Sequence, residues 1–167
     1  RFYKNRNPMQ EIINQYADKF VLLYIGDTGI RRGLKTAIKS IAILKHKINT
    51  VKLVIVGKNS SDNILKKLVK ELQIDPYVDF LGWKEQRLFQ SYILASDICI
   101  SPLHRNLHHD TTYANKIFQY MSLAKPLLVS DAIAQKQSVE KINAGLVHKE
   151  RDVEDFSNKV LALYKSE

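Results

Sequence analysis

The sequence predicts an α/β fold in which helices cover a doubly wound parallel sheet of five or six strands. Three observations support this prediction. Short continuous apolar runs recur along the chain, the first three of them stop at a glycine, and a stretch of helical period follows each one. Continuous apolar runs are typical of strands that helices bury on both faces. Sheets of this kind bind ligands at the carboxyl ends of their strands.

The first half of the chain contains three of the predicted strands. Residues 1–19 are polar and charged, and we expect a linker with a short helix near residues 9–16. Because the chain starts at Arg1 rather than Met, we expect a piece of a longer protein whose N-terminal domain precedes this linker. Apolar runs predict strands at residues 20–25, 51–56 and 78–81. Periodicity predicts helices at residues 33–47 and 62–72, the second capped by Ser60 or Ser61.

The second half repeats the alternation, so that one Rossmann-like domain spans residues 20–167. Helices are predicted at residues 88–94, 133–142 and 153–164, and strands at residues 98–100, 126–130 and 145–147. A further short helix is expected between Ala114 and Lys125, directly before the strand that follows Pro126.

Composition limits the class of protein and its partners. The 167 residues are 45% hydrophobic, which is enough for one well-buried globular domain. There are 26 Lys and Arg against 17 Asp and Glu, and the resulting charge of +9 attracts phosphorylated ligands, polyanions or anionic lipid. The single cysteine, Cys99, lies in an apolar run, so it is expected to pack in the core of a protein of the reducing cytoplasm. No apolar run approaches the roughly 20 residues of a membrane span.

The predicted helix after Ala114 has two distinct faces. Ile117, Phe118 and Met121 share one face, and Asn115, Lys116 and Gln119 share the opposite one. The polar face has two interpretations. It is either an ordinary solvated face, or it offers backbone amides, a lysine and an amide to an anion such as a phosphate.

The loop after the first strand carries glycines and arginines in the sequence Gly-Asp-Thr-Gly-Ile-Arg-Arg-Gly, residues 26–33. Glycine allows close approach of a ligand to the backbone, and arginine binds phosphate oxygens in pairs. The glycine spacing matches neither a dinucleotide fingerprint nor a Walker loop. A tight turn with exposed charges is therefore an alternative to a binding site.

Two further groups of side chains suggest chemistry. Trp83 follows the third strand and is a half-buried aromatic residue in the simplest interpretation. A cluster of polar residues follows the fourth strand, where we expect a basic, mobile loop beside a phosphate site rather than a zinc centre, because no Cys or Glu with metal-ligand spacing accompanies it. The cluster consists of His104, Arg105, His108, His109 and Asp110.

Residues 115–130, Asn-Lys-Ile-Phe-Gln-Tyr-Met-Ser-Leu-Ala-Lys-Pro-Leu-Leu-Val-Ser, resemble the nucleotide-sugar signature of family 4 (group 1) retaining glycosyltransferases. The family pattern is approximately Lys-x-x-Glu-Tyr-Met-Ala-x-Gly-Lys-Pro-Val-Val-Ala-Ser. Gln119 replaces the glutamate that binds the donor ribose, and Ala124 replaces the glycine before Lys-Pro. Thr111, beside Asp110, replaces a carboxylate that contacts the donor sugar in many members. The resemblance covers residues 20–165, nearly the whole chain.

The resemblance implies one half of a GT-B fold, namely the C-terminal, donor-binding domain. It implies that Arg32 and Lys116 are the catalytic cations that contact the donor diphosphate, and Arg31 is a further candidate for this contact. The arginine that often follows the strand glycine is replaced by Asp27. Trp83 would stack on the base or cover the rim of the pocket. The donor-binding residues implied are Gly26, Gly29, Trp83, Lys84, Thr111, Thr112, Tyr113, Ala114, Asn115 and Gln119.

The implied function is transfer of a sugar from a nucleoside-diphosphate sugar to a glycan, lipid-linked or other acceptor, without a metal or other cofactor. The isolated domain is expected to bind nucleotide weakly and to transfer no sugar. Its partners would be the nucleotide sugar and the N-terminal domain of the same protein, with no nucleic acid. We expect a cytoplasmic hexosyltransferase with possible peripheral contact to anionic membrane, through helices such as the one at residues 66–70.

Two other functions stay open on the sequence. A GT-B half-domain that has lost the carboxylates at Thr111 and Gln119 would be a non-catalytic nucleotide-binding or partner-binding module. A sugar-nucleotide epimerase shares the two-domain architecture, although the Lys-x-x-Gln-Tyr-Met signature favours the transferase.

Overall fold

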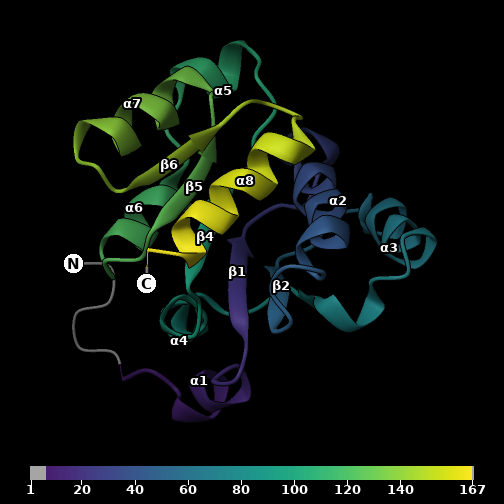
Figure 1. Ribbon diagram of the computed structural model, residues 1–167. Coiled ribbons are helices and arrows are strands. Elements are labelled where there is room, and N and C mark those ends of the chain that lie inside the picture. The colour runs from purple at the N-terminus through teal and green to yellow at the C-terminus, as the bar shows by residue number, and fades with distance from the viewer. Residues whose placement is uncertain (1–6, 167) are drawn as a thin grey trace.

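The computed structural model describes residues 7–166, and these residues contain a sheet of six parallel strands in the order β3-β2-β1-β4-β5-β6 (Figure 1). This order and direction confirm the doubly wound, Rossmann-like prediction, with the larger of the two expected numbers of strands. The strands are β1 Phe20–Ile25, β2 Val51–Val56, β3 Val78–Gly82, β4 Ile98–Ser101, β5 Leu127–Ser130 and β6 Gly145–His148.

The central strand β1 shows why the apolar runs are continuous. All six of its residues are buried, and alternate side chains enter two separate hydrophobic cores. Leu22 and Tyr24 belong to one core, whereas Val21, Leu23 and Ile25 belong to the other. A strand buried on both faces needs apolar side chains at every position, which removes the alternation of a half-exposed strand.

Helices supply the second wall of each core. Side chains of α2, α3 and α8 pack in the core with Leu22, and those of α1, α4, α6 and α7 pack in the core with Val21. In Figure 1, α8 lies in front of the sheet with α2 beside it. The helices are α1 Gln10–Gln15, α2 Leu34–Leu44, α3 Asp62–Glu71, α4 Phe89–Leu94, α5 Leu107–Thr111, α6 Asn115–Met121, α7 Ile133–Lys141 and α8 Val153–Tyr164, with short 3-10 helices at Ile30–Arg32, Asp75–Tyr77 and Gln86–Leu88.

The loops that follow β1 and β4 touch at the carboxyl edge of the sheet. The strand order reverses between these two strands, which makes their ends the expected ligand crevice of a doubly wound fold. The His104 amide donates a hydrogen bond to the Arg31 carbonyl at 3.0 Å. Gly33 has a φ of 76°, and a Cβ at this position would lie 1.7 Å from the Pro102 carbonyl oxygen. Glycine is therefore required where the two loops cross.

Several expectations about local structure were wrong. The polar cluster after β4 is not an irregular loop, since residues Leu107–Thr111 form helix α5, whose start is capped by the Asn106 side chain accepting from the His109 amide. On α6 the buried residues are Ile117 and Tyr120, while Phe118 is exposed and packs against Tyr113. The first six residues of the expected linker lie outside the described residues.

Two smaller expectations can also be compared with the structure. Ser61 is the residue at the N-cap of α3, but its hydroxyl makes no capping hydrogen bond. Cys99 is fully buried, as expected, and burial raises the pKa of its thiol to about 12. Among residues 7–166, every helix is too short or too polar to cross a lipid bilayer.

Candidate functional site

The side chain of Lys116 ends in a polar group with an unusual environment. Its Nζ atom is buried and has no hydrogen-bond partner in the part of the chain that the structure describes. It lies 3.6 Å from the centre of the Tyr24 ring. Burial, with the nearby Arg32 guanidinium as a second cause, lowers the pKa of the Lys116 amine well below its ordinary value. An unpaired buried amine costs folding free energy, so its retention needs an explanation outside the fold.

The end of β1 is shaped around this amine. Gly26 follows β1, and a Cβ at this position would lie 3.2 Å from Lys116 Nζ. The Tyr24 hydroxyl below it donates to the Asp27 carbonyl at 2.6 Å. The amine therefore lies between the Tyr24 ring and the backbone of Gly26, the first residue after β1. This geometry rules out the solvated interpretation of the Lys116 side chain.

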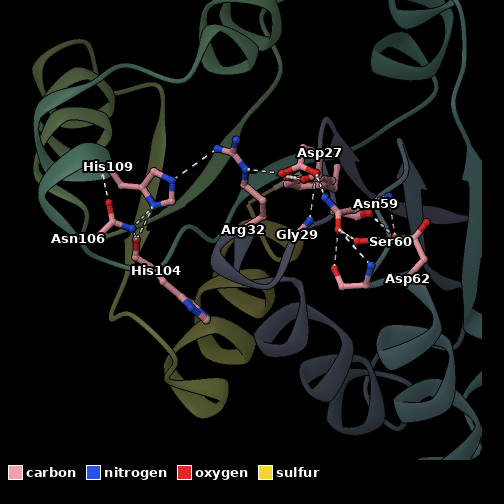
Figure 2. A network of polar contacts seen from close by, with 12 residues as sticks. Asp27, Gly29, Arg32, Asn59, Ser60, Asp62, His104, Asn106 and His109 are labelled. Carbon is pink, nitrogen blue, oxygen red and sulfur yellow. Dashed lines mark hydrogen bonds and ion pairs between the residues drawn. The ribbon is translucent and has the colours of Figure 1, made fainter.

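Arg32 reaches across the same loop between two acceptors (Figure 2). Its Nε donates to Asp27 Oδ2 at 3.2 Å, and its Nη1 lies 3.5 Å from His109 Nε2. His109 Nδ1 lies 2.6 Å from the His104 carbonyl oxygen, which can only accept, so Nδ1 carries the proton and Nε2 is left to accept from Arg32. Burial lowers the pKa of His109, which agrees with a neutral ring.

Asp27 is the anionic centre of the network in Figure 2. Its Oδ1 accepts from Asn59 Nδ2 at 2.6 Å and from the Gly29 amide at 3.3 Å. Burial acts in the opposite direction, but the hydrogen bonds from Asn59 and Arg32 hold the pKa of the Asp27 carboxyl below its usual value. The carboxylate is therefore charged at neutral pH and fixed in place from several directions.

A hollow of about 310 Å³ opens beside this network, at the carboxyl edge of β1 and β2. Arg31 and Arg32 contribute its positive charge, and Asp27 contributes a negative one. The backbone of Gly29 forms part of its wall, as expected for a loop that a ligand approaches closely. The other lining residues are Ile30, Asn59 and Ser61.

The structure brings four of the predicted site residues together. Gly26, Gly29 and Arg32 lie on the β1 loop, and Lys116 reaches the end of β1 from α6. Lys116 Nζ lies beside Gly26, and Asp27, the next residue, pairs with Arg32 at 3.2 Å, so the three side chains gather at the end of β1. This proximity is what a clamp formed by Arg32 and Lys116 requires.

Other predicted donor residues lie at the same edge of the sheet but are not joined to these cations. Trp83 is 65% exposed on the loop after β3, so the half-buried interpretation was wrong. Lys84 follows it and is partly exposed. A hydrogen bond from the Gly57 amide to the Gly82 carbonyl, 2.8 Å long, ties this loop to the end of β2. Neither Trp83 nor Lys84 lines the hollow.

The segment between α5 and α6 carries the remaining predicted residues. The Thr111 hydroxyl donates to the Leu107 carbonyl at 2.7 Å within its own helix. Thr112, Tyr113 and Asn115 are exposed, Gln119 is partly exposed, and Ala114 is the N-cap of α6 without a side-chain cap. The site role predicted for these residues stays a prediction. Helix α6 has only seven residues, so its end is a weak source of positive potential.

The polar cluster around α5 has mainly structural contacts. Arg105 pairs with Asp110 at 3.3 Å, and Asp110 also accepts from the Ile133 amide at the start of α7 at 3.0 Å. No group of three or more potential metal-ligating side chains occurs within residues 7–166. His109 is the member of the cluster that reaches the candidate site, through Arg32.

Two residues of the site were not predicted from the sequence. Tyr24 lies below Lys116, and Asn59 holds Asp27. His109, which accepts from Arg32, belongs to the cluster that was expected beside a phosphate site. The position of Asn59 two residues after Gly57, at the end of a buried strand, could have suggested a role at the carboxyl edge. Tyr24 gave no such signal, because it is one apolar position among six in β1.

Comparison with known sequences identifies the family. A model described as glycosyl transferases group 1 matches residues 19–166. The putative glycosyltransferase EpsD of Bacillus subtilis (strain 168) is 21% identical over 147 residues, which are 88% of this chain and 37% of EpsD. The chain thus spans well under half the length of this curated relative.

Solved structures show the same fold at low sequence identity. The C-terminal domain of the group 1 glycosyl transferase LpcC from Francisella tularensis matches with a TM-score of 0.77 and 16% identity, over 97% of this chain and 83% of that one. HepE from Anabaena, solved in complex with UDP, matches with a TM-score of 0.82 and 16% identity, over 99% of this chain and 45% of that one. The chain belongs to the group 1 glycosyl transferases, and its fold is that of the C-terminal domain of a GT-B enzyme.

Proposed function

We propose that this domain binds the diphosphate of a nucleoside-diphosphate sugar between Arg32 and Lys116, as the donor half of a retaining glycosyltransferase. The observation that carries the proposal is the buried, unpartnered amine of Lys116 beside the β1 loop. A bound anion would provide the partner that this amine lacks within residues 7–166. The related HepE structure contains UDP, which supports a nucleotide as the ligand.

The two cations suggest how the domain would promote transfer. When the bond between the sugar and the diphosphate breaks, negative charge develops on the leaving diphosphate. Arg32 and Lys116 would stabilise this charge from fixed positions, which is electrostatic catalysis by protein groups. Positive charge for the leaving group is therefore available without a divalent cation, and we propose that the domain uses no metal or other cofactor.

Lys116 must change its surroundings when the anion binds. In the free domain its amine is folded against the Tyr24 ring under Gly26. Extending the side chain toward the hollow would exchange this aromatic contact for a charge-assisted hydrogen bond to phosphate, which is roughly twice as strong as a neutral one. The ligand would also restore the ordinary pKa of the amine, because an opposite charge favours the protonated form.

Neighbouring residues would hold the rest of the donor. Gln119 lies one helical turn beyond Asn115 and would bond the ribose hydroxyls as a neutral partner. Trp83 offers an exposed aromatic face to the base from the loop after β3. The segment 111–115 would contact the sugar. Acceptor binding would require the N-terminal half that GT-B enzymes place opposite this domain, so the chain alone is expected to bind nucleotide without transferring sugar.

Calorimetric titration tests the clamp. The chain is titrated with UDP, GDP and ADP, alongside the variants Arg32→Ala, Lys116→Ala and Lys67→Ala. The last is a charge-matched control, since Lys67 is 79% exposed and pairs with Glu71 on α3, away from the hollow. Loss of a charged contact typically costs about 1.5–3 kcal/mol, so both site variants should weaken binding at least about tenfold. Addition of EDTA should leave the affinity unchanged.

The outcomes of this titration separate the possibilities. Weaker binding in both site variants, with the Lys67 variant unchanged, supports the clamp. Equal affinity of all four proteins for the nucleotide that binds would show that the diphosphate lies elsewhere. Absence of binding to any nucleotide would refute the nucleotide-binding proposal for this domain.

A further inference from the structure

Asp27 puts a carboxylate inside the site that the diphosphate would occupy. Its Oδ2 lies 3.2 Å from Arg32 Nε, and its side chain is 43% exposed on the wall of the hollow. Arg32 cannot bind a phosphate oxygen without bringing that oxygen close to the carboxylate. Two like charges at such a separation repel even in a water-like dielectric.

The carboxylate is held and cannot readily turn away from a ligand. Asn59 Nδ2 donates to its Oδ1 at 2.6 Å, and the Gly29 amide donates to the same atom at 3.3 Å. Asn59 belongs to the loop after β2 and Gly29 to the loop after β1, so two separate backbone segments fix the group. The negative charge is therefore a built feature of the site rather than one exposed rotamer among several.

Repulsion from a fixed carboxylate depends on the charge of the ligand. A nucleoside-diphosphate sugar has one negative charge on each phosphate, because the sugar esterifies the terminal one. The free nucleoside diphosphate has an additional charge at neutral pH, since the second pKa of a terminal phosphate is about 6. The cations Arg32 and Lys116 attract this additional charge, and Asp27 opposes that attraction.

We propose that Asp27 shifts the relative affinity of the site toward the sugar-bearing nucleotide and away from the free nucleoside diphosphate. The proposal rests on the diphosphate clamp described above. Without the carboxylate, two cations would bind the more highly charged product more tightly than the donor. With it, the product loses more affinity than the donor, which would favour release of the nucleotide after transfer.

The test is a ratio of two affinities. Calorimetry measures the dissociation constants of UDP and UDP-glucose, GDP and GDP-mannose, and ADP and ADP-glucose for the chain and for three variants. Asp27→Asn removes the charge and keeps the shape, Asp27→Glu restores the charge, and Glu71→Gln removes one distant negative charge from α3. One additional charge about 6 Å from a carboxylate in water changes affinity about threefold. Asp27→Asn should therefore favour the free diphosphate about threefold more than the unaltered chain does.

The expected result is a shift of the ratio in Asp27→Asn, with Asp27→Glu and Glu71→Gln close to the unaltered chain. In 0.5 M salt the difference in this ratio between Asp27→Asn and the unaltered chain should shrink, because the screening length falls below the roughly 10 Å of 0.1 M salt. An unchanged ratio in Asp27→Asn, or an equal shift in Glu71→Gln, overturns the role of Asp27 while the clamp stands. Failure of the unaltered chain to bind any of these nucleotides overturns the clamp and the role of Asp27 together.

Discussion

The buried amine of Lys116 is unfavourable for folding, whereas the proposed binding of an anion requires it. Its Nζ is buried against Tyr24 and lacks a hydrogen-bond partner among the residues described. The contact with the ring recovers part of the desolvation cost, because an ammonium over an aromatic face is worth about 2 kcal/mol when desolvated. The rest of the desolvation cost is explained if the site binds an anion, because functional sites commonly keep groups that destabilise the free protein.

Lys116→Met separates the effect of the amine on stability from its effect on nucleotide binding. Methionine fills nearly the same space without a polar group, and replacing a buried charge by an apolar side chain is often stabilising. We expect the variant to unfold in urea with a free energy about 1 kcal/mol higher than the unaltered chain, and to lose nucleotide affinity. Lys125→Met is the control, because Lys125 Nζ already donates to the Leu94 and Ser96 carbonyls. It should be less stable. A destabilised Lys116→Met protein with full affinity would contradict the role given to the amine.

Single residues were predicted with mixed success. The resemblance placed Arg32 and Lys116 in one site; Lys116 Nζ lies beside Gly26 and Arg32 pairs with the next residue, Asp27, while their shared role stays a prediction. The exposure of Phe118 could not be predicted, because a seven-residue helix offers too few turns to define one apolar stripe. Tyr120 takes the buried position and accepts a hydrogen bond from the Ile25 amide at 2.9 Å. That contact joins residues 95 positions apart, and periodicity carries no information on it.

Among the elements, the loops after β1 and β4 set the position of Arg32. Gly33 ends the 3-10 helix that carries Arg32 and lies against the Pro102 carbonyl, while the Arg31 carbonyl accepts from the His104 amide. These two contacts between the loops therefore fix the Arg32 guanidinium between Asp27 and His109. The geometry of the site depends on close backbone packing between two segments far apart in the sequence.

Gly33→Ala should disturb both folding and binding. The added methyl group would meet the Pro102 oxygen, and its backbone conformation is unfavourable for alanine. We expect a loss of roughly 3 kcal/mol in the free energy of unfolding, as for other strained backbone positions, together with weaker nucleotide binding. Gly82→Ala is the control, because that glycine has a φ of 67° but no atom within 4 Å of the added Cβ. It should lose only about 1 kcal/mol. Similar losses in the two variants would show that contact with Pro102 is unimportant.

The bounds of helices and strands were predicted well where the burial of apolar side chains alone determines them. The bounds of β1, β2 and α8 agree with the apolar runs and the helical period. The one large apolar side chain of α5, Leu107, is 83% exposed. The helix therefore has no apolar face that the periodicity of the sequence could reveal, and it was missed. The hydrogen bond from the Ile133 amide, at the start of α7, to Asp110 depends on tertiary structure, whereas the Asn106 cap is a local contact. Such short helices cannot be recognised by periodicity.

At the scale of the whole molecule, buried histidines link stability to pH. His148 is fully buried on β6, donates from Nδ1 to the Lys149 carbonyl, and packs against Phe156. Burial lowers its pKa from the ordinary 6.5, as it does for His104 and His109. Between the folded and unfolded pKa values the unfolded chain binds more protons. The stability is therefore fully present above about pH 6.5 and is lost as the pH falls through the folded pKa values.

Urea denaturation between pH 7.5 and 5 measures this effect. The free energy of unfolding should fall with decreasing pH, by at most about 1.4 kcal/mol per pH unit for each histidine. His148→Gln cannot titrate, so its stability should fall less steeply, while His104 and His109 preserve part of the slope. The exposed His46→Gln provides the control and should follow the unaltered chain. Parallel curves for His148→Gln and the unaltered chain would exclude His148 as a source of the pH dependence.

The doubly wound sheet accounts for the position of the whole site. Parallel strands gather the loops after β1, β2 and β3 at one edge, and α6 delivers Lys116 to the same place. This arrangement followed from the sequence, whereas the internal pairing of Arg32 with Asp27 did not, because side-chain contacts across a loop leave no periodic signal. The contact of Lys66–Lys70 with membrane remains a prediction.

A crystal structure of the chain with the nucleoside diphosphate that binds it tests the central claim most directly. We predict that the Lys116 side chain leaves the Tyr24 ring, and that its Nζ and the Arg32 guanidinium lie within hydrogen-bonding distance of the phosphate oxygens. A diphosphate bound elsewhere, with Lys116 still buried against Tyr24, would contradict the account.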